Sequence, residues 1–528
     1  MIIAAMMFLP HAVAQIEVGF GTPYASAASV ITGPGIYFDQ YNMVIGGNEL
    51  SLESIGGAAA TGSGSGQLAQ YWQAQSPNGK YIAASYAYLK DSGAYSYKFV
   101  PSSTTSSASV TGHVAATDAD DILFGGFAYN GKAFASVDLV GDYADFIKYD
   151  NALSASKSKV SAEQTFTAEG AENFKIGAYA AKGTFDPEVP EAGLPESLSL
   201  TDNPDLAAGQ FATITGGDIK SYTSSASVSD TTASASQKAA ITEVTPGEDN
   251  IENPIPAEAQ FWGFSWQSNP KTGISVGAKT YTDIWGADVG EVDAETLGNV
   301  GYNAKATSTS KGTASASQDD IKAEGAEYFN ADAWSDRGEG LYVLAFAAPY
   351  IDLLPPVAAG PTSTPVSSLY ANQYSWLYDE NGMVIKSYKS SASVDEKTAT
   401  ASQSLSTKGT ANEAGFYGNA GRSGIDKYTY AGTNDYLYGG KDIIYNAKST
   451  GTASGSASAS QDLKAGNVAS FYGSDYAYDS YYYDSGKYLG SSQYASLSSP
   501  LGVDITSYKS SSSVDAKTAT SSQSLSTK

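Results

Sequence analysis

The side chains that enzymes most often use for nucleophilic or acid–base chemistry are scarce in this sequence. The 528 residues contain two histidines, His11 and His113, and no cysteine. Without cysteine the chain has no thiol nucleophile, disulfide, iron–sulfur cluster or thiolate zinc site. The zinc-protease motif His-Glu-x-x-His is also missing. The sequence therefore predicts a protein that is not an enzyme, with no catalytic residue and no cofactor.

Two acidic clusters could supply oxygen ligands to calcium. Asp118, Asp120 and Asp121 form one cluster, and Glu248 and Asp249 form the other. Neither has the spacing of a calcium loop, and solvated acidic turns are the simpler interpretation. We predict no metal site, although calcium binding by these turns stays open. A carboxylate pair for glycoside hydrolysis also stays open, because such a pair leaves no short sequence signature.

One stretch partly matches a phosphate-binding loop. It runs from Gly126 to Lys132, but Ala133 stands where the motif has a hydroxyl residue. Its Asn130-Gly131 pair is instead typical of the short turn that joins two antiparallel strands. We interpret this stretch as a hairpin and not as a nucleotide site.

Composition and charge narrow the range of partners. The formal net charge of −25 disfavours nucleic acid and anionic lipid surfaces, both of which attract Lys and Arg. Only 16% of the residues are charged, yet 38 Tyr, 18 Phe and 6 Trp are present, so the composition is not that of a disordered chain. No stretch beyond the N-terminus approaches the roughly 20 apolar residues of a membrane helix. We expect no nucleic-acid partner and no membrane span.

The N-terminal residues resemble an export signal. Residues 2–9 are mostly apolar, and Ala12-Val13-Ala14 has the small-residue pattern of a cleavage site. Residues 1–14 are therefore predicted to be a signal peptide, which places the mature chain, residues 15–528, outside the cell. No Lys or Arg precedes the apolar run, so an ordinary N-terminal strand is the alternative.

Two sequence elements recur and alternate along the mature chain. The segment Ser387–Lys408 recurs almost unchanged at Ser507–Lys528. A second element begins at Tyr302 and has relatives that begin at Tyr149 and Tyr445. The spacing between copies is irregular, so we expect insertions of different lengths in a common scaffold and not a strict solenoid.

Within the repeats, side chains alternate with the period of a β-strand. Ala399, Ala401, Gln403 and Leu405 share one face, and the Thr and Ser residues between them share the other. Residues 395–397 interrupt the alternation, as a hairpin turn would.

Turn signals and prolines complete the expected fold. Hairpin turns are predicted at three Asn-Gly pairs, at residues 78–79, 130–131 and 381–382. Because proline lacks the donor that a central strand requires, surface excursions are expected at three Pro-rich stretches, near residues 187–204, 246–256 and 355–365. We predict an all-β fold, an elongated array of β-hairpins with irregular internal repeats, forming extended sheets that continue between subunits.

The small side chains have consequences for packing and for assembly. They should let facing sheets approach more closely than the usual spacing of about 10 Å, and they leave stability to backbone hydrogen bonds and aromatic packing. Such sheets expose edges that can pair with other chains. The C-terminal repeat, Ser507–Lys528, lacks the segment that follows its twin, so we predict that it is such an edge. The expected assembly residues are Tyr508, Ser510, Ser512, Val514, Thr518, Thr520 and Ser522.

These features together resemble the amyloid-like sheath proteins of filamentous methanogenic archaea. The likeness rests on the export signal, the absence of cysteine, the Tyr-rich hairpins and the interleaved Tyr-Lys-Ser-Ser-Ala-Ser-Val and Thr-Ala-Ser-Ala-Ser-Gln units. It covers nearly the whole mature chain. It implies a structural protein whose subunits join laterally through continuous β-sheets into hoops, which stack into a tube around the cells. The partner that it implies is the protein itself.

Two other classes stay as alternatives. A repeat-built surface adhesin or polysaccharide-binding β-solenoid would use aromatic rings as sugar platforms, with Trp262, Trp266 and Trp285 as candidates. A β-helical polysaccharide lyase or hydrolase is the third class. Self-assembly without a ligand would separate the first class from the second, and sugar cleavage would support the third.

Overall fold

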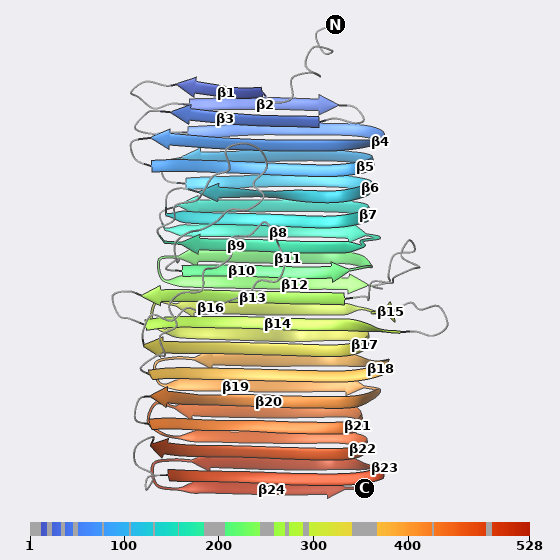
Figure 1. Ribbon diagram of the computed structural model, residues 1–528, viewed down its shortest axis with the longest axis vertical. Coiled ribbons are helices and arrows are strands. Elements are labelled where there is room, and N and C mark those ends of the chain that lie inside the picture. Colours follow the sequence, from blue (N-terminus) through green and yellow to red (C-terminus); the bar gives the residue numbers. More distant parts are fainter. Residues whose placement is uncertain are drawn as a thin grey trace. The chain divides into compact units, whose positions relative to one another are not determined.

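The computed structural model of the chain consists of β-strands joined by turns (Figure 1). No helix occurs in the residues that it describes, which are 12–17, 24–32, 37–45, 51–76, 79–104, 107–129, 132–156, 158–183, 206–242, 258–269, 274–288, 295–339, 367–424, 427–481 and 488–528. Side chains are described only beyond residue 107. The all-β prediction is therefore confirmed. The three Pro-rich stretches and residues 1–11 of the predicted signal peptide lie outside the described residues.

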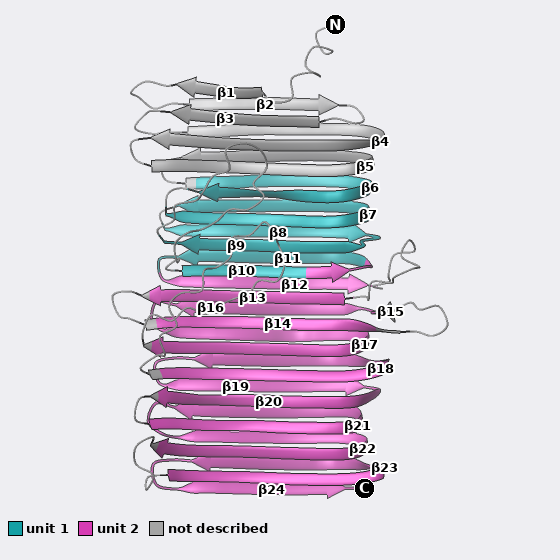
Figure 2. Cartoon of the chain, in the orientation of Figure 1, with its two compact units in different colours: residues 1–212, 218–230, 346–358 teal, residues 213–217, 231–345, 359–528 magenta. Residues whose placement is uncertain are grey.

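The chain forms two compact units (Figure 2). Unit 1 comprises residues 1–212, 218–230 and 346–358, and unit 2 comprises residues 213–217, 231–345 and 359–528. The strands of unit 1 are β1 (Ala12–Glu17), β2 (Tyr24–Thr32), β3 (Tyr37–Ile45), β4 (Ser51–Ser76), β5 (Gly79–Thr104), β6 (Ser107–Tyr129), β7 (Ala133–Ser156), β8 (Lys159–Glu169), β9 (Asn173–Lys182), most of β10 (Leu206–Thr215) and β11 (Asp218–Ser229). The strands of unit 2 are β12 (Thr232–Thr242), β13 (Glu258–Asn269), β14 (Ile274–Asp288), β15 (Glu295–Thr296), β16 (Val300–Thr309), β17 (Thr313–Glu339), β18 (Ser367–Val394), β19 (Thr398–Lys408), β20 (Thr410–Gly424), β21 (Lys427–Thr452), β22 (Ala457–Tyr481), β23 (Tyr488–Val514) and β24 (Ala519–Thr527).

In unit 2 each long strand contributes its two halves to two different layers of one continuous sheet. Residues 367–378 of β18 pair with β20, whereas residues 384–394 pair with β19. β21 in turn pairs with both β20 and β19. Residues in the left-handed conformation break the regular pleat between the two halves. In unit 2 the left-handed residues between the two paired halves of these strands are Asp320, Gly325, Gly382, Gly409, Gly439, Asp442, Asn467 and Gly502.

The two layers of unit 2 pack face to face. The repeat layer holds the recurring Ser- and Ala-rich segments, namely β12, β16, β19, β24, residues 313–323 of β17, 384–394 of β18, 441–452 of β21, 457–468 of β22 and 503–514 of β23. The aromatic layer holds β13, β14, β20 and the remaining parts of β17, β18, β21, β22 and β23. Side chains of one layer reach the backbone of the other: Ser335 Oγ donates to the carbonyl of Ala392 at 2.7 Å, and Ser449 Oγ donates to that of Gly418 at 3.2 Å.

The expected alternation of the repeat is present in β19. Ala399, Ala401, Gln403 and Leu405 are buried, while the Thr and Ser residues between them are half-buried. The predicted turn at 395–397 is also confirmed, because Asp395 accepts hydrogen bonds from the backbone N–H groups of residues 397 and 398 at 2.7 and 2.8 Å. The strand period and the turn chemistry were therefore both visible in the sequence.

The prediction of a hairpin turn at Asn381-Gly382 is wrong. These residues lie inside β18, where Gly382 has a φ of 75° and bends the strand without reversing it. β17 pairs antiparallel with β18 on both sides of the bend. The chain therefore continues along β17 past Gly382 and does not fold back to pair with itself. By contrast, β4 and β5 form a hairpin with Ser76 opposite Gly79, although residues 77–78 and 130–131 themselves lie outside the described residues.

The register aligns equivalent positions of the repeat layer into two buried rows. In one row, Tyr388 lies opposite Leu405, which lies opposite Tyr445. In the other row, Ser390 lies opposite Gln403, which lies opposite Ala447. The tyrosines of the first row are Tyr302, Tyr388, Tyr445 and Tyr508. They are among the largest fully buried side chains.

Small residues bring the two layers of unit 2 unusually close together. A Cβ atom on Gly451 in the repeat layer would lie 2.7 Å from the Cα of Gly421 in the aromatic layer. Phe416 and Tyr445 fill the wider part of the interface, with ring centroids 4.2 Å apart. Small side chains thus allow close approach, and stacked rings supply the apolar burial that Ala and Ser cannot.

Unit 1 divides its pairing in the same way. Residues 51–59 of β4 pair with β2, and residues 67–75 pair with β3, which pairs further with β1. These N-terminal pairs are parallel, whereas the sequence predicted antiparallel hairpins throughout. Ala12–Ala14, the predicted cleavage site, begin β1.

Candidate assembly surface

The seven predicted assembly residues lie on β23, in the turn that follows it and on β24. Tyr508, Ser510, Ser512 and Val514 lie on β23, which pairs with β22 on one side and β24 on the other. All four are at most 4% exposed, so they lie inside the sheet and not at its edge. Thr518 precedes β24, and its backbone N–H and hydroxyl group donate to Asp515 at 2.8 and 2.9 Å. Thr520 and Ser522 lie on β24 and are exposed.

Among the described residues, β24 is the outermost strand of the repeat layer. Within the part of the chain that the structure describes, it pairs with β23 alone. The aromatic layer has an equivalent edge, because residues 488–498 of β23 pair only with β22. Each edge presents a row of backbone N–H and C=O groups on the side away from its partner.

The buried rows of the repeat layer continue onto β24, where they become exposed. By register, Gln523 is equivalent to Gln461, and Leu525 is equivalent to Leu463. Gln461 and Leu463 are 5% and 0% exposed, whereas Leu525 is 37% exposed and Gln523 is also exposed. β24 therefore carries the same side chains as the buried rows, but in β24 they are exposed.

Neither edge carries the usual protection against pairing. Natural proteins place Lys, Pro or inward-pointing charges on exposed edge strands. β24 reads ATSSQSLST, and residues 488–498 read YLGSSQYASLS, so both segments lack charge and proline.

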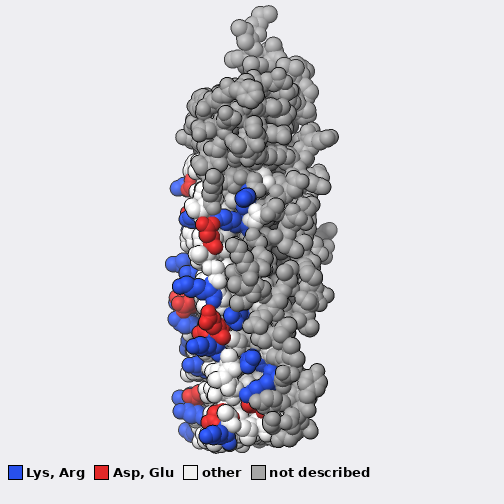
Figure 3. All heavy atoms as spheres, turned by 90° about the vertical axis from the view of Figure 1, so that its left-hand side faces the viewer, with Lys and Arg blue, Asp and Glu red and all other residues white. Residues whose placement is uncertain are grey.

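The outer face of the repeat layer, in contrast, carries paired charges. Lys389 lies 2.6 Å from Asp319, and Lys509 lies 3.7 Å from Asp462. Figure 3 shows basic and acidic side chains interspersed on one side of the molecule. These charges favour contact with water, whereas the two sheet edges carry no charge that would oppose pairing with another strand.

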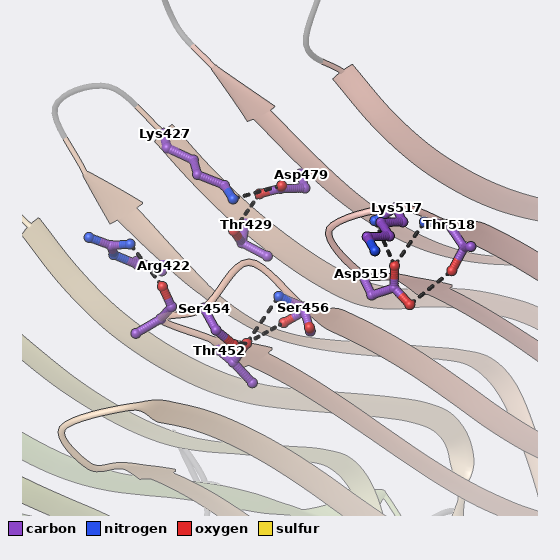
Figure 4. A network of polar contacts seen from close by, with 11 residues as sticks. Arg422, Lys427, Thr429, Thr452, Ser454, Ser456, Asp479, Asp515, Lys517 and Thr518 are labelled. Atoms are coloured by element: carbon purple, nitrogen blue, oxygen red, sulfur yellow. Dashed lines mark hydrogen bonds and ion pairs between the residues drawn. The ribbon is translucent and has the colours of Figure 1, made fainter.

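Polar contacts hold the turns beside the edge in place (Figure 4). The Asp515 carboxylate accepts from the backbone N–H groups of Lys517 and Thr518 at 2.7 and 2.8 Å, which fixes the β23–β24 turn. Lys427 pairs with Asp479 at 2.8 Å, and the Thr429 hydroxyl group donates to the same carboxylate at 2.7 Å. The end of unit 2 is thus ordered by its own contacts.

The structure places the sequence's other candidate groups as follows. His113 contacts Asp150 at 2.5 Å on a half-exposed surface. Gly126–Tyr129 ends β6, and Lys132 directly precedes β7, which pairs antiparallel with β6 through Tyr129 and Phe134, so no helix follows this stretch. One motif was missed in the sequence: the stretch Gly273–Gly277 fits the Gly-x-Ser-x-Gly pattern of hydrolases, but Ser275 is buried within a strand beside Ser268. Among the described residues, no cluster of three or more acidic or histidine side chains could hold a metal ion.

One tryptophan is placed as a sugar platform would require. Trp266 is 6% exposed, but Trp285 is 41% exposed, and its indole N–H donates to Asp283 at 2.7 Å. Burial and the neighbouring Asp283 raise the pKa of Glu258 to about 7. An exposed ring therefore lies beside the buried Asp283 and the half-buried Glu258 in the aromatic layer, which no sequence motif indicated.

Several buried carboxyl groups bind protons more tightly than free aspartate. Burial raises the pKa of Asp138 to about 8, that of Asp336 to about 7 and that of Asp332 to about 6. These groups are partly or wholly neutral near pH 7, so the folded protein carries less negative charge than the formal value of −25.

Comparisons with models of known protein families, with curated protein sequences and with solved structures found no match. Across the described residues no helix is long and apolar enough to cross a membrane.

Proposed function

We propose that this protein is a structural subunit of an extracellular sheath, and that it self-assembles through its sheet edges into hoops or tubes. One observation carries the proposal: at β24 the buried Gln and Leu rows of the repeat layer become exposed. A strand from another copy, together with the layer that faces it, would bury Gln523 and Leu525 as their equivalents are buried. The resemblance to archaeal sheath proteins supports the same function.

The joint requires both layers. The nine residues of β24 offer about nine hydrogen bonds, each worth roughly 0.5–1.5 kcal/mol net. That gain is comparable with the roughly 4–15 kcal/mol that association costs. Pairing along residues 488–498 of the aromatic layer as well provides the surplus that a stable assembly needs.

The strands that best fit this edge are β1 and β2 of a second copy. β2 has nine residues, as β24 does, and within the described residues it pairs with β4 alone. β1 pairs with β3 alone in the same part of the chain. A contact between different surfaces of two copies propagates, and it closes into a hoop only if the rotation per subunit permits.

Charge on the inward face of β24 tests the proposal. In the Gln523→Lys/Leu525→Lys variant both lysines stay in water in a single copy, but they would be buried uncompensated in the joint. The variant should fold with a β-type circular dichroism spectrum and stay monomeric by light scattering. The matched control is Ser522→Lys/Ser524→Lys, on the outward face of the same strand, which should polymerise. Polymerisation of the inward variant at the wild-type rate would exclude β24 as the joint.

A polysaccharide-binding surface is the second candidate function, because Trp285 is exposed beside Asp283 and Glu258. Replacing Trp285 with Ala should abolish retention on insoluble neutral glycans if this function is right. Equal retention of the variant and the wild type, or none for either, would reject it.

A further inference from the structure

Phenol groups of three adjacent strands meet on the face of the aromatic layer that points away from the repeat layer. Tyr417 lies on β20, Tyr430 on β21 and Tyr476 on β22. Because side chains alternate along a strand, the neighbouring Phe416 faces the repeat layer instead. The Tyr417 and Tyr430 hydroxyl oxygens are 2.9 Å apart, and the Tyr476 hydroxyl donates to that of Tyr430 at 3.2 Å. The three hydroxyl groups therefore form a chain of hydrogen bonds across three strands.

Packing alone does not account for this arrangement. The rings of Tyr430 and Tyr476 stack, with centroids 5.4 Å apart and planes 21° apart. Phenylalanine rings would stack in the same way, so stacking does not explain why hydroxyl groups meet. The Tyr445 hydroxyl, by contrast, donates to the Asp435 carboxylate at 2.8 Å. In the Tyr430–Tyr476 pair each phenol has another phenol as its neighbour, so two oxidisable rings lie side by side.

Two glycines make room for this contact. Gly421 lies opposite Tyr430, and Gly432 lies opposite Tyr476. A Cβ atom on Gly432 would collide with the Tyr476 hydroxyl oxygen, and one on Gly421 would lie 2.9 Å from Cδ2 of Tyr430. Because neither glycine has a side chain, each ring can lie across the strand next to it. The close approach of the two phenols therefore depends on the residue opposite each of them.

The hydrogen bonds also provide a path for a proton. Burial raises the pKa of Tyr430 and that of Tyr476 above the usual value of about 10, so both phenols are protonated near pH 7. A protonated phenol that loses an electron must also release its proton. The neighbouring hydroxyl oxygen lies at hydrogen-bond distance and can accept it. This coupling favours one-electron oxidation at the hydrogen-bonded pair.

Further tyrosines connect the pair with the open edge of the aromatic layer. The ring centroid of Tyr478 lies 5.2 Å from that of Tyr430 and 6.5 Å from that of Tyr488. Tyr488 is the first residue of β23 and is 62% exposed. An oxidant in water can therefore remove an electron from Tyr488, and electrons can pass outward along the row of rings. The half-buried pair need not contact the oxidant itself.

We propose that Tyr430 and Tyr476 form an oxidative cross-linking site, at which a peroxidase-type one-electron oxidant and H₂O₂ join the two rings. Each phenol loses one electron and its hydroxyl proton. The two phenoxyl radicals then form a carbon–carbon bond between ring positions ortho to the hydroxyl groups, and the two ortho hydrogens move to the oxygens and restore both phenols. The two electrons and two protons that are released reduce one H₂O₂ to two water molecules.

Such a bond would join β21 to β22 covalently in a chain that has no cysteine. It would close a loop between residues 430 and 476, which lowers the entropy of the unfolded chain and so stabilises the folded one. The two rings belong to one copy of the protein, so the site does not depend on the proposed self-assembly.

Treatment of the full-length chain with a peroxidase and limiting H₂O₂ tests the site. The wild type should develop dityrosine fluorescence. Mass spectrometry of its peptides should find a pair that joins residues 430 and 476 and lacks two hydrogen atoms. A mixture of isotope-labelled and unlabelled chains should give this pair without mixed labels, because the bond forms within one copy.

Conservative variants separate the phenol pair from the general reactivity of tyrosine. Tyr430→Phe keeps the ring, so the chain should fold with a wild-type circular dichroism spectrum and lose the linked pair. Tyr436→Phe is the matched control, because Tyr436 lies on the same strand, directly opposite Tyr472, and these two residues are 41% and 39% exposed. This variant should keep the link between residues 430 and 476. Coupling of Tyr436 to Tyr472 in preference to that link, absence of the link from the wild type, or mixed labels in it would overturn the proposal.

Discussion

Replacing Asp138 with Asn should change how the stability of unit 1 depends on pH. Asp138 lies on β7 with 3% of its surface exposed, and burial raises its pKa from 3.8 to about 8. The folded state therefore keeps a proton that the unfolded state releases near pH 4. In the wild type, this contribution to stability is fully present below about pH 4 and is lost as the pH rises through about 8.

The size of the effect follows from the shift. About four pKa units, at 1.36 kcal/mol per unit, correspond to about 5 kcal/mol between pH 4 and pH 8. Asparagine has the shape of protonated aspartic acid but does not ionise. The variant should therefore equal the wild type at pH 4 and exceed it by several kcal/mol at pH 8.

Hydrogen exchange of β7 backbone amides measures the local opening free energy without requiring the whole chain to unfold as one step. It is best carried out at pH 4, 6 and 8 on the monomeric Gln523→Lys/Leu525→Lys background. Asp142→Asn on the same strand provides the control, because it removes an exposed carboxylate and leaves Asp138 in place, so the pH dependence that Asp138 imposes should persist. Parallel pH profiles for Asp138→Asn and the wild type would refute the reasoning.

Three further predictions concern packing and turns. Gly451→Ala should lower the free energy of unfolding by about 1–3 kcal/mol, because the two layers touch at Gly451. Gly466→Ala should lower it less, because the nearest atom to the added Cβ would be 3.4 Å away. Chemical denaturation of both variants measures the difference. In the same assay, Tyr388→Ala should lower the free energy of unfolding by about 3–5 kcal/mol, because Tyr388 is fully buried. Tyr488 is 62% exposed, so Tyr488→Ala should lower it by less than about 0.5 kcal/mol. Similar losses for the two variants would contradict the buried row. Asp395→Ala should lower the free energy of unfolding by about 1–2 kcal/mol and speed hydrogen exchange in the β18–β19 hairpin, because two backbone N–H groups lose their acceptor. Unchanged exchange would show that the turn does not need the carboxylate.

Much of the local structure could be predicted from the sequence, because strand period and turn chemistry are short-range properties. The alternation around Gln403 determines which side chains are buried in β19. Asp395 closes the turn that follows β18 through bonds to residues only two and three positions away. The absence of helix from the described residues follows from the same short-range pattern.

The tertiary structure decided the features that depend on which strand lies alongside. Asn381-Gly382 bends β18 and does not reverse it, because β17 pairs on both sides of the bend. Tyr508 lies inside the sheet, and the exposed edge is β24, because the two strands of that hairpin are ordered by pairing with β22 and not by sequence position. Asp435 and Asp475 resemble any other acidic residues of a Tyr-rich strand, and only the packing of a second layer over them removes water from their carboxylates. Burial of a polar group is a property of its neighbours in space, and the sequence lists only its neighbours along the chain.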